Sequence, residues 1–168
     1  MYGSAPPALR VLTSADAAAY NAFLSEGVLA HPDTLRISPG DIARAPFKTE
    51  GGAEGCTFAA CADDGTWLGV VTVEREAGRE KRRHIAWIYR MYVARSASGR
   101  GIGRALLQAA LGRARELPGV TKVNLTVAAH NERAVALYES AGFREFAREP
   151  DAFRDEVPRT ELSMTCVL

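Results

Sequence analysis

Hydrophobic positions along the chain follow two periods, and the change from one to the other marks the expected elements. Four apolar runs before residue 94 have the length and the β-branched or aromatic content of strands. They cover residues 8–12, 56–62, 67–76 and 84–93. Within the third run, Gly69, Val71 and Val73 would share one face of a sheet, because side chains alternate along a strand.

Helical spacing, with apolar residues three or four positions apart, appears three times. The helices would cover residues 17–29, 102–117 and 132–141. Thr13 or Ser14 would cap the first helix and Asn131 the third, which Gly142 would end. Prolines and glycine pairs interrupt residues 31–55, which therefore predict one broken helix and a loop.

Three more strands are expected in the second half of the chain, at residues 120–128, 143–148 and 161–168. The helix at 102–117 joins two strands through short connections, so these strands should be parallel neighbours with a right-handed crossover. A long loop is expected over residues 149–159. Its Asp151, Asp155 and Glu156 would either attract a cationic amine or form a solvated turn.

A glycine-rich turn separates the strand ending at residue 93 from the helix that follows. Gly99, Gly101 and Gly103 lack side chains that would keep a ligand from the backbone amides, and Arg100 and Arg104 add positive charge. Amides in the first turn of a helix have no partner within the helix and favour anions. The turn therefore predicts a site for a phosphate or pyrophosphate. Its spacing matches neither a Walker A loop nor a dinucleotide-binding fingerprint.

Composition narrows the class of protein. The chain has 168 residues, 47% of them hydrophobic and 24% charged, and its net charge is +1, which predicts a globular protein without nucleic acid as its partner. Cys56, Cys61 and Cys166 form no CxxC pair, so we expect reduced thiols and no metal site. The first ten residues lack signal-peptide features and no apolar run could span a membrane, so a cytoplasmic protein is expected.

Two motifs resemble the GNAT superfamily of N-acetyltransferases. The strand end MYV followed by SGRGIGRALL is similar to the family's acetyl-CoA signature, although Ser98 stands where Gln or Arg is usual. The segment NERAVALYESAGF, from Asn131 to Phe143, resembles the family's following helix. The resemblance implies an α/β GNAT fold: a mixed sheet of six or seven strands, a splayed central strand pair, and helices on both faces. Residues 1–168 would form one domain.

The resemblance also implies which residues contact acetyl-CoA. Backbone groups at the end of the strand would bind the pantetheine arm as an added strand does, and the amides of the glycine turn would bind the pyrophosphate. The expected contact residues are Met91, Tyr92, Val93, Ser98, Gly99, Arg100, Gly101, Ile102, Gly103, Arg104, Asn131, Ala134 and Tyr138.

Direct attack of an amine on the acetyl group is the reaction that the resemblance implies. Tyr138 would hydrogen-bond to the departing thiolate, unless it is only an aromatic residue of the core. An amine with a pKa near 10.4 is neutral in about one molecule per thousand at pH 7, so a base is needed. The strand at 84–93 contains no acid. Glu74, or Glu76 on the same strand, is the nearest candidate, and a water relay to backbone carbonyls is the alternative.

The predicted function is acetyl transfer to the amine of a small molecule or to a protein N-terminus, by a monomer or a homodimer. Two alternatives stay open: a non-catalytic module that binds acetyl-CoA or CoA, and a partner-binding domain without a cofactor. His84 and His130 are expected to have structural roles.

Overall fold

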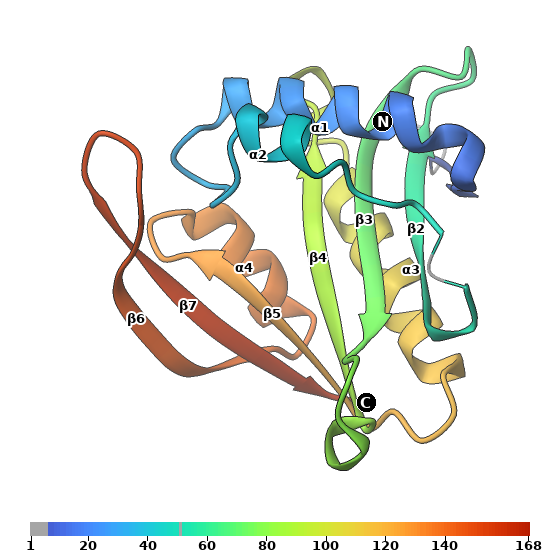
Figure 1. The fold of residues 1–168 in the computed structure, drawn as a ribbon, viewed down its shortest axis with the longest axis vertical. Coiled ribbons are helices and arrows are strands. Elements are labelled where there is room, and N and C mark those ends of the chain that lie inside the picture. The colour runs from blue at the N-terminus through green and yellow to red at the C-terminus, as the bar shows by residue number, and fades with distance from the viewer. Residues whose placement is uncertain (1–6, 51) are drawn as a thin grey trace, which may run out of the picture.

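The computed structural model describes residues 7–50 and 52–168, so most of the stretch used for the signal-peptide prediction lies outside the described residues. In the described part, seven strands form one sheet in the order β1-β2-β3-β4-β5-β7-β6 (Figure 1). All neighbours are antiparallel except β4 and β5, so the predicted mixed sheet is confirmed. The strands are β1 (Ala8–Val11), β2 (Gly55–Cys61), β3 (Trp67–Arg75), β4 (Ile85–Val93), β5 (Lys122–Ala128), β6 (Arg144–Arg154) and β7 (Pro158–Val167).

Helices cover both faces of the sheet, as predicted (Figure 1). The first pair packs on one face around Leu24, Val28 and Val70, and the second pair packs on the other face with Leu106 and Val71. The helices are α1 (Ala17–Ala30), α2 (Pro39–Arg44), α3 (Ile102–Glu116) and α4 (Glu132–Ser140). Short 3-10 turns cover Ser14–Asp16, Gly52–Glu54, Glu80–Arg82 and Arg95–Ala97.

Local sequence explains where the short helix α2 begins. The Ser38 hydroxyl accepts a hydrogen bond from the Asp41 amide at 3.1 Å, and the Asp41 carboxylate accepts one from the Ser38 amide at 2.8 Å. This reciprocal cap, with Pro39 at the first helical position, satisfies amides that have no partner within the helix. It accounts for the broken helix expected in residues 31–55.

The central strands β4 and β5 separate after three paired residues. Ile85–Trp87 of β4 pairs with residues 122–124 of β5. Beyond this ladder, within the part of the chain that the structure describes, β4 pairs only with β3, and β5 only with β7. The two strands diverge toward their carboxyl ends (Figure 1). The splayed pair is therefore confirmed, and backbone groups along one edge of residues 88–93 have no neighbouring strand among the described residues.

A bulge in β4 changes the direction of its side chains beside this opening. Val71 of β3 lies opposite two residues of β4, Arg90 and Met91, because the register shifts between Val70 and Thr72. Arg90 has a φ of 49°, a left-handed conformation that is uncommon outside glycine.

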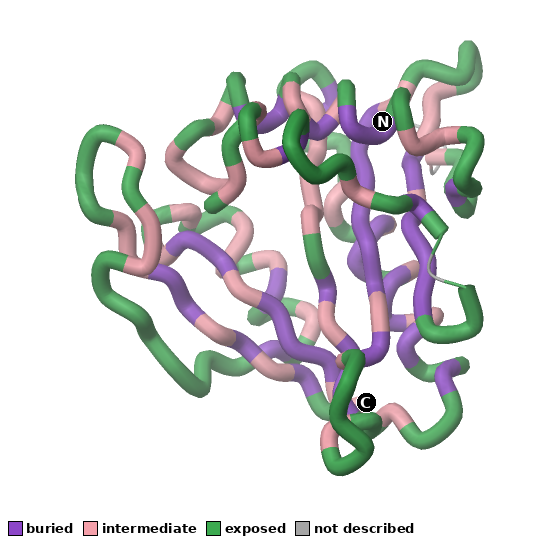
Figure 2. Tube along the Cα trace, viewed as in Figure 1, coloured by how far each residue is buried: buried purple, intermediate pink, exposed green. Residues whose placement is uncertain are grey.

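The expected loop over residues 149–159 is wrong. Strand β6 continues to Arg154 and β7 begins at Pro158, which leaves a turn of three residues. The prediction failed because the sequence of β6 has no apolar alternation. Figure 2 shows that this edge strand is exposed along most of its length. An edge strand tolerates Pro150, and the register shift between Glu149 and Phe153 accommodates Asp151 at a φ of 53°.

Candidate active site between β4 and β5

A cavity of about 650 Å³ occupies the opening between β4 and β5. Its α3–α4 side is lined by the glycine turn, by Met91 and Val93, and by residues of α4 including Tyr138. Its α1–α2 side is lined by residues 34–37, Phe47, Tyr89, Arg90 and Glu161. The cavity thus reaches both faces of the sheet through the splay.

All residues predicted to contact acetyl-CoA line this cavity except Arg100. Gly99 and Gly101 have φ values of 82° and 78°, which glycine adopts without strain. A Cβ on Gly101 would meet no atom within 4 Å, so open space lies beside its backbone. Gly101 begins α3 without a side-chain cap, which leaves the first amides of the helix available to an anion. The turn therefore fits the predicted pyrophosphate.

Gly103 has a different role from the other two glycines. A Cβ at this position would lie 3.2 Å from the Leu137 side chain and 3.5 Å from that of Met91. This glycine lets α3 approach α4 closely, and the same contact brings α4 and its tyrosine beside β4.

Arg133 is a cavity residue that sequence analysis missed. Its Nη1 donates a hydrogen bond to the Ser98 hydroxyl at 2.5 Å, so a guanidinium from α4 lies over the start of the glycine turn. Ser98 departs from the Gln or Arg of the resembled motif, and Arg133 supplies a cation at that place. An arginine on the exposed side of a predicted helix gives no local signal of this contact.

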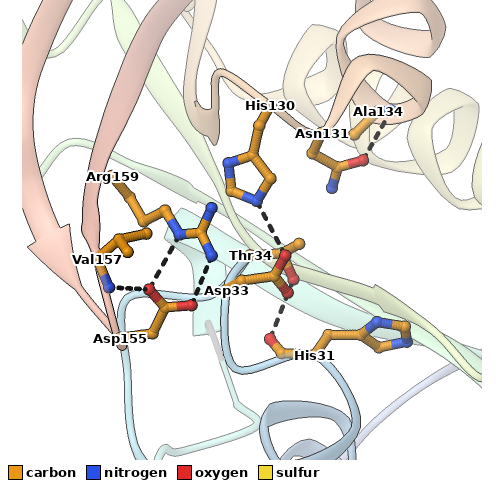
Figure 3. Close-up of polar contacts among 9 residues, drawn as sticks. All are labelled: His31, Asp33, Thr34, His130, Asn131, Ala134, Asp155, Val157 and Arg159. Carbon is orange, nitrogen blue, oxygen red and sulfur yellow. Dashed lines mark hydrogen bonds and ion pairs between the residues drawn. The ribbon is translucent and has the colours of Figure 1, made fainter.

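Tyr138 is buried and its hydroxyl faces β4. The hydroxyl donates to the Met91 sulfur at 3.6 Å, and the ring packs edge-on against Phe143 at 5.9 Å between centroids. Burial raises the pKa of Tyr138 to about 12, so the phenol keeps its proton at neutral pH. The helix that holds it begins at Asn131, whose side chain accepts from the Ala134 amide at 3.2 Å (Figure 3).

The acids predicted from topology lie on β3 or just after it and do not line the cavity. Glu74 pairs with Trp87 of β4 and Gly55 of β2. Glu76 accepts hydrogen bonds from Arg82 and from the Trp87 ring nitrogen, and the contact with Arg82 is the main reason that its pKa falls to about 2.

Glu161 is the one carboxylate that lines the cavity among the described residues. Only 8% of its side chain is exposed, and its Oε1 lies 2.9 Å from Arg36. Burial raises the pKa of Glu161, although Arg36 acts in the opposite direction. Sequence analysis placed this residue at the start of an alternating strand. Only the pairing of β7 with β5 brings it beside the opening.

Two other acids of the β6–β7 hairpin, Asp151 and Asp155, are held by neighbouring arginines. Asp151 accepts a hydrogen bond from Arg154. Asp155 accepts two from Arg159, at 2.8 and 3.0 Å, as Figure 3 shows. The hydrogen bond from Arg159 is the largest of the effects that hold the pKa of Asp155 well below its usual value. Neither acid lines the cavity, and neither does Glu156.

A contact between side chains links two segments beside the cavity. His130 Nε2, in the turn before α4, lies 3.1 Å from Asp33 Oδ2, in the segment after α1 (Figure 3). The neighbours His31, Thr34 and Asn131 line the cavity. Within the described residues, no cluster of His, Cys, Asp and Glu suits a metal ion, and no helix has the length and apolar character needed to cross a membrane.

Fold and cleft together define an α/β protein in which one cavity joins a glycine turn at a helix start to the unpaired edge of a central strand. The family model of the GNAT acetyltransferases matches residues 20–143. The chain therefore belongs to the GNAT family of acetyltransferases, and it is an acyltransferase by class. Comparison of the sequence with curated proteins finds no match.

Solved structures of this family resemble the chain over nearly its whole length. A GCN5-related N-acetyltransferase from Kribbella flavida is 30% identical, with a TM-score of 0.80 over 96% of this chain and 97% of that chain. A ribosomal-protein-alanine N-acetyltransferase from Brucella melitensis is 25% identical, with a TM-score of 0.75 over 96% and 99%. A phosphinothricin acetyltransferase from Sinorhizobium meliloti, solved with acetyl-CoA, shares the fold at 23% identity, with a TM-score of 0.81 over 98% and 89%.

Proposed function

We propose that this protein transfers the acetyl group of acetyl-CoA to an amine. The observation that carries the proposal is that one cavity joins the glycine turn, the unpaired edge of β4 and the Tyr138 hydroxyl. The solved phosphinothricin acetyltransferase with acetyl-CoA bound supports the choice of donor. The acceptor would be a small-molecule amine or a protein N-terminus, and the protein would act in the cytoplasm as one domain, alone or as a homodimer.

Residues on the α3–α4 side would hold the donor. The first amides of α3 would bind the pyrophosphate, with Arg104 and Arg133 beside them, and the unpaired backbone groups of residues 88–93 would bind the amide-rich arm. Acetyl-CoA, when bound, supplies the acetyl thioester that the amine attacks. The amine would enter from the α1–α2 side, where residues 34–37 and Phe47 line the cavity.

Two side chains would handle protons and charge. Tyr138 keeps its proton because its pKa is about 12, well above the reference value near 8.5 for a thiol, so it would stabilise a thiolate by a hydrogen bond without giving up the proton. Glu161 would accept a proton from the attacking amine, because it is the described carboxylate in the cavity and burial raises its pKa. Glu74 stays a candidate base from the sequence, and a matched pair of variants separates the two.

Acetyl-CoA titration by calorimetry and thiol release with a panel of amines test this function. We expect saturable binding and release of free CoA with at least one amine. Tyr138→Phe should lower kcat about 10- to 100-fold, since it removes one hydrogen bond to a developing charge, while the Kd for acetyl-CoA stays unchanged. Equal losses in both quantities would mean that the hydroxyl is structural. Tight binding without thiol release from any amine would favour a CoA-binding module, and no binding would favour a partner-binding domain.

A further inference from the structure

Arg90 lies on the α1–α2 side of the cavity in a strained backbone conformation. It belongs to the bulge of β4, and its φ of 49° is one that non-glycine residues adopt at a cost. The bulge places Arg90 against α1, while the next residue, Met91, packs on the opposite face beside Tyr138. Such strain is frequent at functional sites, where the surrounding structure holds the residue in place.

A chain of buried side chains orients the Arg90 guanidinium. Its Nε donates to the Tyr20 hydroxyl at 2.9 Å, Tyr20 contacts the Thr72 hydroxyl at 3.2 Å, and Thr72 contacts the Thr57 hydroxyl at 2.8 Å. Tyr20, Thr72 and Thr57 are all buried. The guanidinium carbon also lies 4.2 Å from the centre of the Phe47 ring. These contacts fix the plane of the guanidinium and use only one of its three nitrogens.

No carboxylate of residues 7–50 and 52–168 forms an ion pair with Arg90. The nearby Arg36 is neutralised by Glu161, so the α1–α2 side keeps the positive charge of Arg90 without compensation. An acceptor with only an ammonium group would be repelled by this charge. An acceptor that also carries an anion would be attracted, and its amine could face Glu161.

We propose that the acceptor is an amine that carries a carboxylate, as an amino acid does, and that Arg90 binds this carboxylate through Nη1 and Nη2. The two nitrogens form a planar fork that matches the two oxygens of a carboxylate. This inference rests on the proposed acetyl transfer and names the acceptor class for the same cavity. It favours a free small molecule over a protein N-terminus, because the first residue of a polypeptide has no α-carboxylate.

Pairs of acceptors that differ only in charge test the proposal. Each of a set of L-amino acids is compared with its carboxamide, and 4-aminobutyrate and a peptide with a free N-terminus are added. For the wild-type protein, at least one amino acid of the set should have a kcat/KM at least about 10-fold higher than its carboxamide, as expected for a charged hydrogen bond. In Arg90→Gln this preference should fall to about one, and Arg90→Lys should restore part of it.

Arg10→Gln is the matched control, since Arg10 also lies over an aromatic ring, Trp67, at 5.8 Å but does not line the cavity. It should leave the preference unchanged, and acetyl-CoA affinity should be equal in all variants if they are folded. Equal rates with amino acids and amides, a preference that survives Arg90→Gln, or turnover confined to the peptide would overturn the proposal and leave acetyl transfer intact.

A binding experiment separates failure of this proposal from failure of the proposed function. The CoA-saturated protein is titrated with the amino acids and the amides, which requires no turnover. Binding of an amino acid that is lost in Arg90→Gln would support the carboxylate site even if no amine is acetylated. Equal binding, or no binding of either compound, would refute the site.

Discussion

At the scale of single residues, the cavity has a carboxylate and a phenol on its two sides, for which we propose opposite tasks. Burial raises the pKa of both Glu161 and Tyr138. For the carboxylate this makes a stronger base, and for the phenol it makes a group that stays a hydrogen-bond donor through the physiological range. The low exposure of the two side chains thus supports proton acceptance on one side and stabilisation of negative charge on the other.

Glu161→Gln tests the base. Because Glu161 has a raised pKa, wild-type kcat/KM should fall as the pH drops through a value above the ordinary carboxylate pKa, where the folded protein takes up the proton. The variant should lack this acid limb. At pH 7 the kcat/KM of the variant should be at least about 100-fold below the wild-type value. Its rate should recover at high pH, where the amine loses its own proton.

Glu74→Gln is the comparison for this experiment, since Glu74 does not line the cavity. We expect it to keep both the rate and the pH profile. A loss confined to Glu74→Gln would instead establish the base predicted from strand topology. Unchanged profiles in both variants would favour a water relay.

At the scale of elements, the three glycines of the glycine turn have two different structural roles. Gly99 and Gly101 adopt positive φ values, and open space lies beside Gly101, whereas Gly103 allows contact between helices. The spacing of the turn predicts an anion site at Gly101 but does not reveal the packing role of Gly103, which depends on where α4 lies.

Gly101→Leu should weaken acetyl-CoA binding at least about 100-fold, because the side chain would project into the space beside the first amides of α3. The change also strains a residue at φ 78°, at a cost of roughly 1–3 kcal/mol. Gly119→Leu is the matched control, since Gly119 has a φ of 75°, equally open surroundings and no place in the cavity. Both variants should lose similar thermal stability, and calorimetry should detect weaker binding only for Gly101→Leu. Equal affinity in the two variants would refute the site.

Sequence patterns located the elements better than they located the residues of the cavity. Buried strands such as β3 and β4 alternate or run apolar, so their ends were predicted within one residue. The edge strand β6 has charged and proline residues on both faces and resembled a loop. Tyr138 and the glycines belong to motifs that are continuous in sequence. Arg90 and Glu161 reach the cavity through a bulge and through the pairing of distant strands, which no local pattern reveals.

At the scale of the whole molecule, the sheet consists of two parts joined by a short ladder. One part contains β1 to β4, and the other contains β5, β7 and β6. Among residues 7–50 and 52–168, the two parts pair only through Ile85–Trp87 and residues 122–124. The extended arm of a ligand would therefore bridge the two parts of the sheet, so ligand binding should order the strand edges beside the splay.

Hydrogen exchange measures this contribution. Acetyl-CoA at about 100 times its Kd should slow exchange of the cleft-facing amides of residues 88–93 by up to about 100-fold. Amides of β2, which pairs with β1 and β3 away from the cleft, are the internal control and should change little. Equal protection of both strands would indicate general stabilisation, and no change in β4 would contradict binding of the arm along its edge.

Strand β6 forms one outer edge of the sheet and is poorly suited to pair with a further strand. Pro150 offers no amide hydrogen, and the left-handed Asp151 beside it interrupts the regular ladder. Charged side chains follow along the exposed strand, so a second polypeptide would meet an interrupted row of backbone groups and would have to desolvate ions. The β6 edge therefore disfavours self-association into fibrils through strand pairing. The gap between β4 and β5 remains open to an extended ligand.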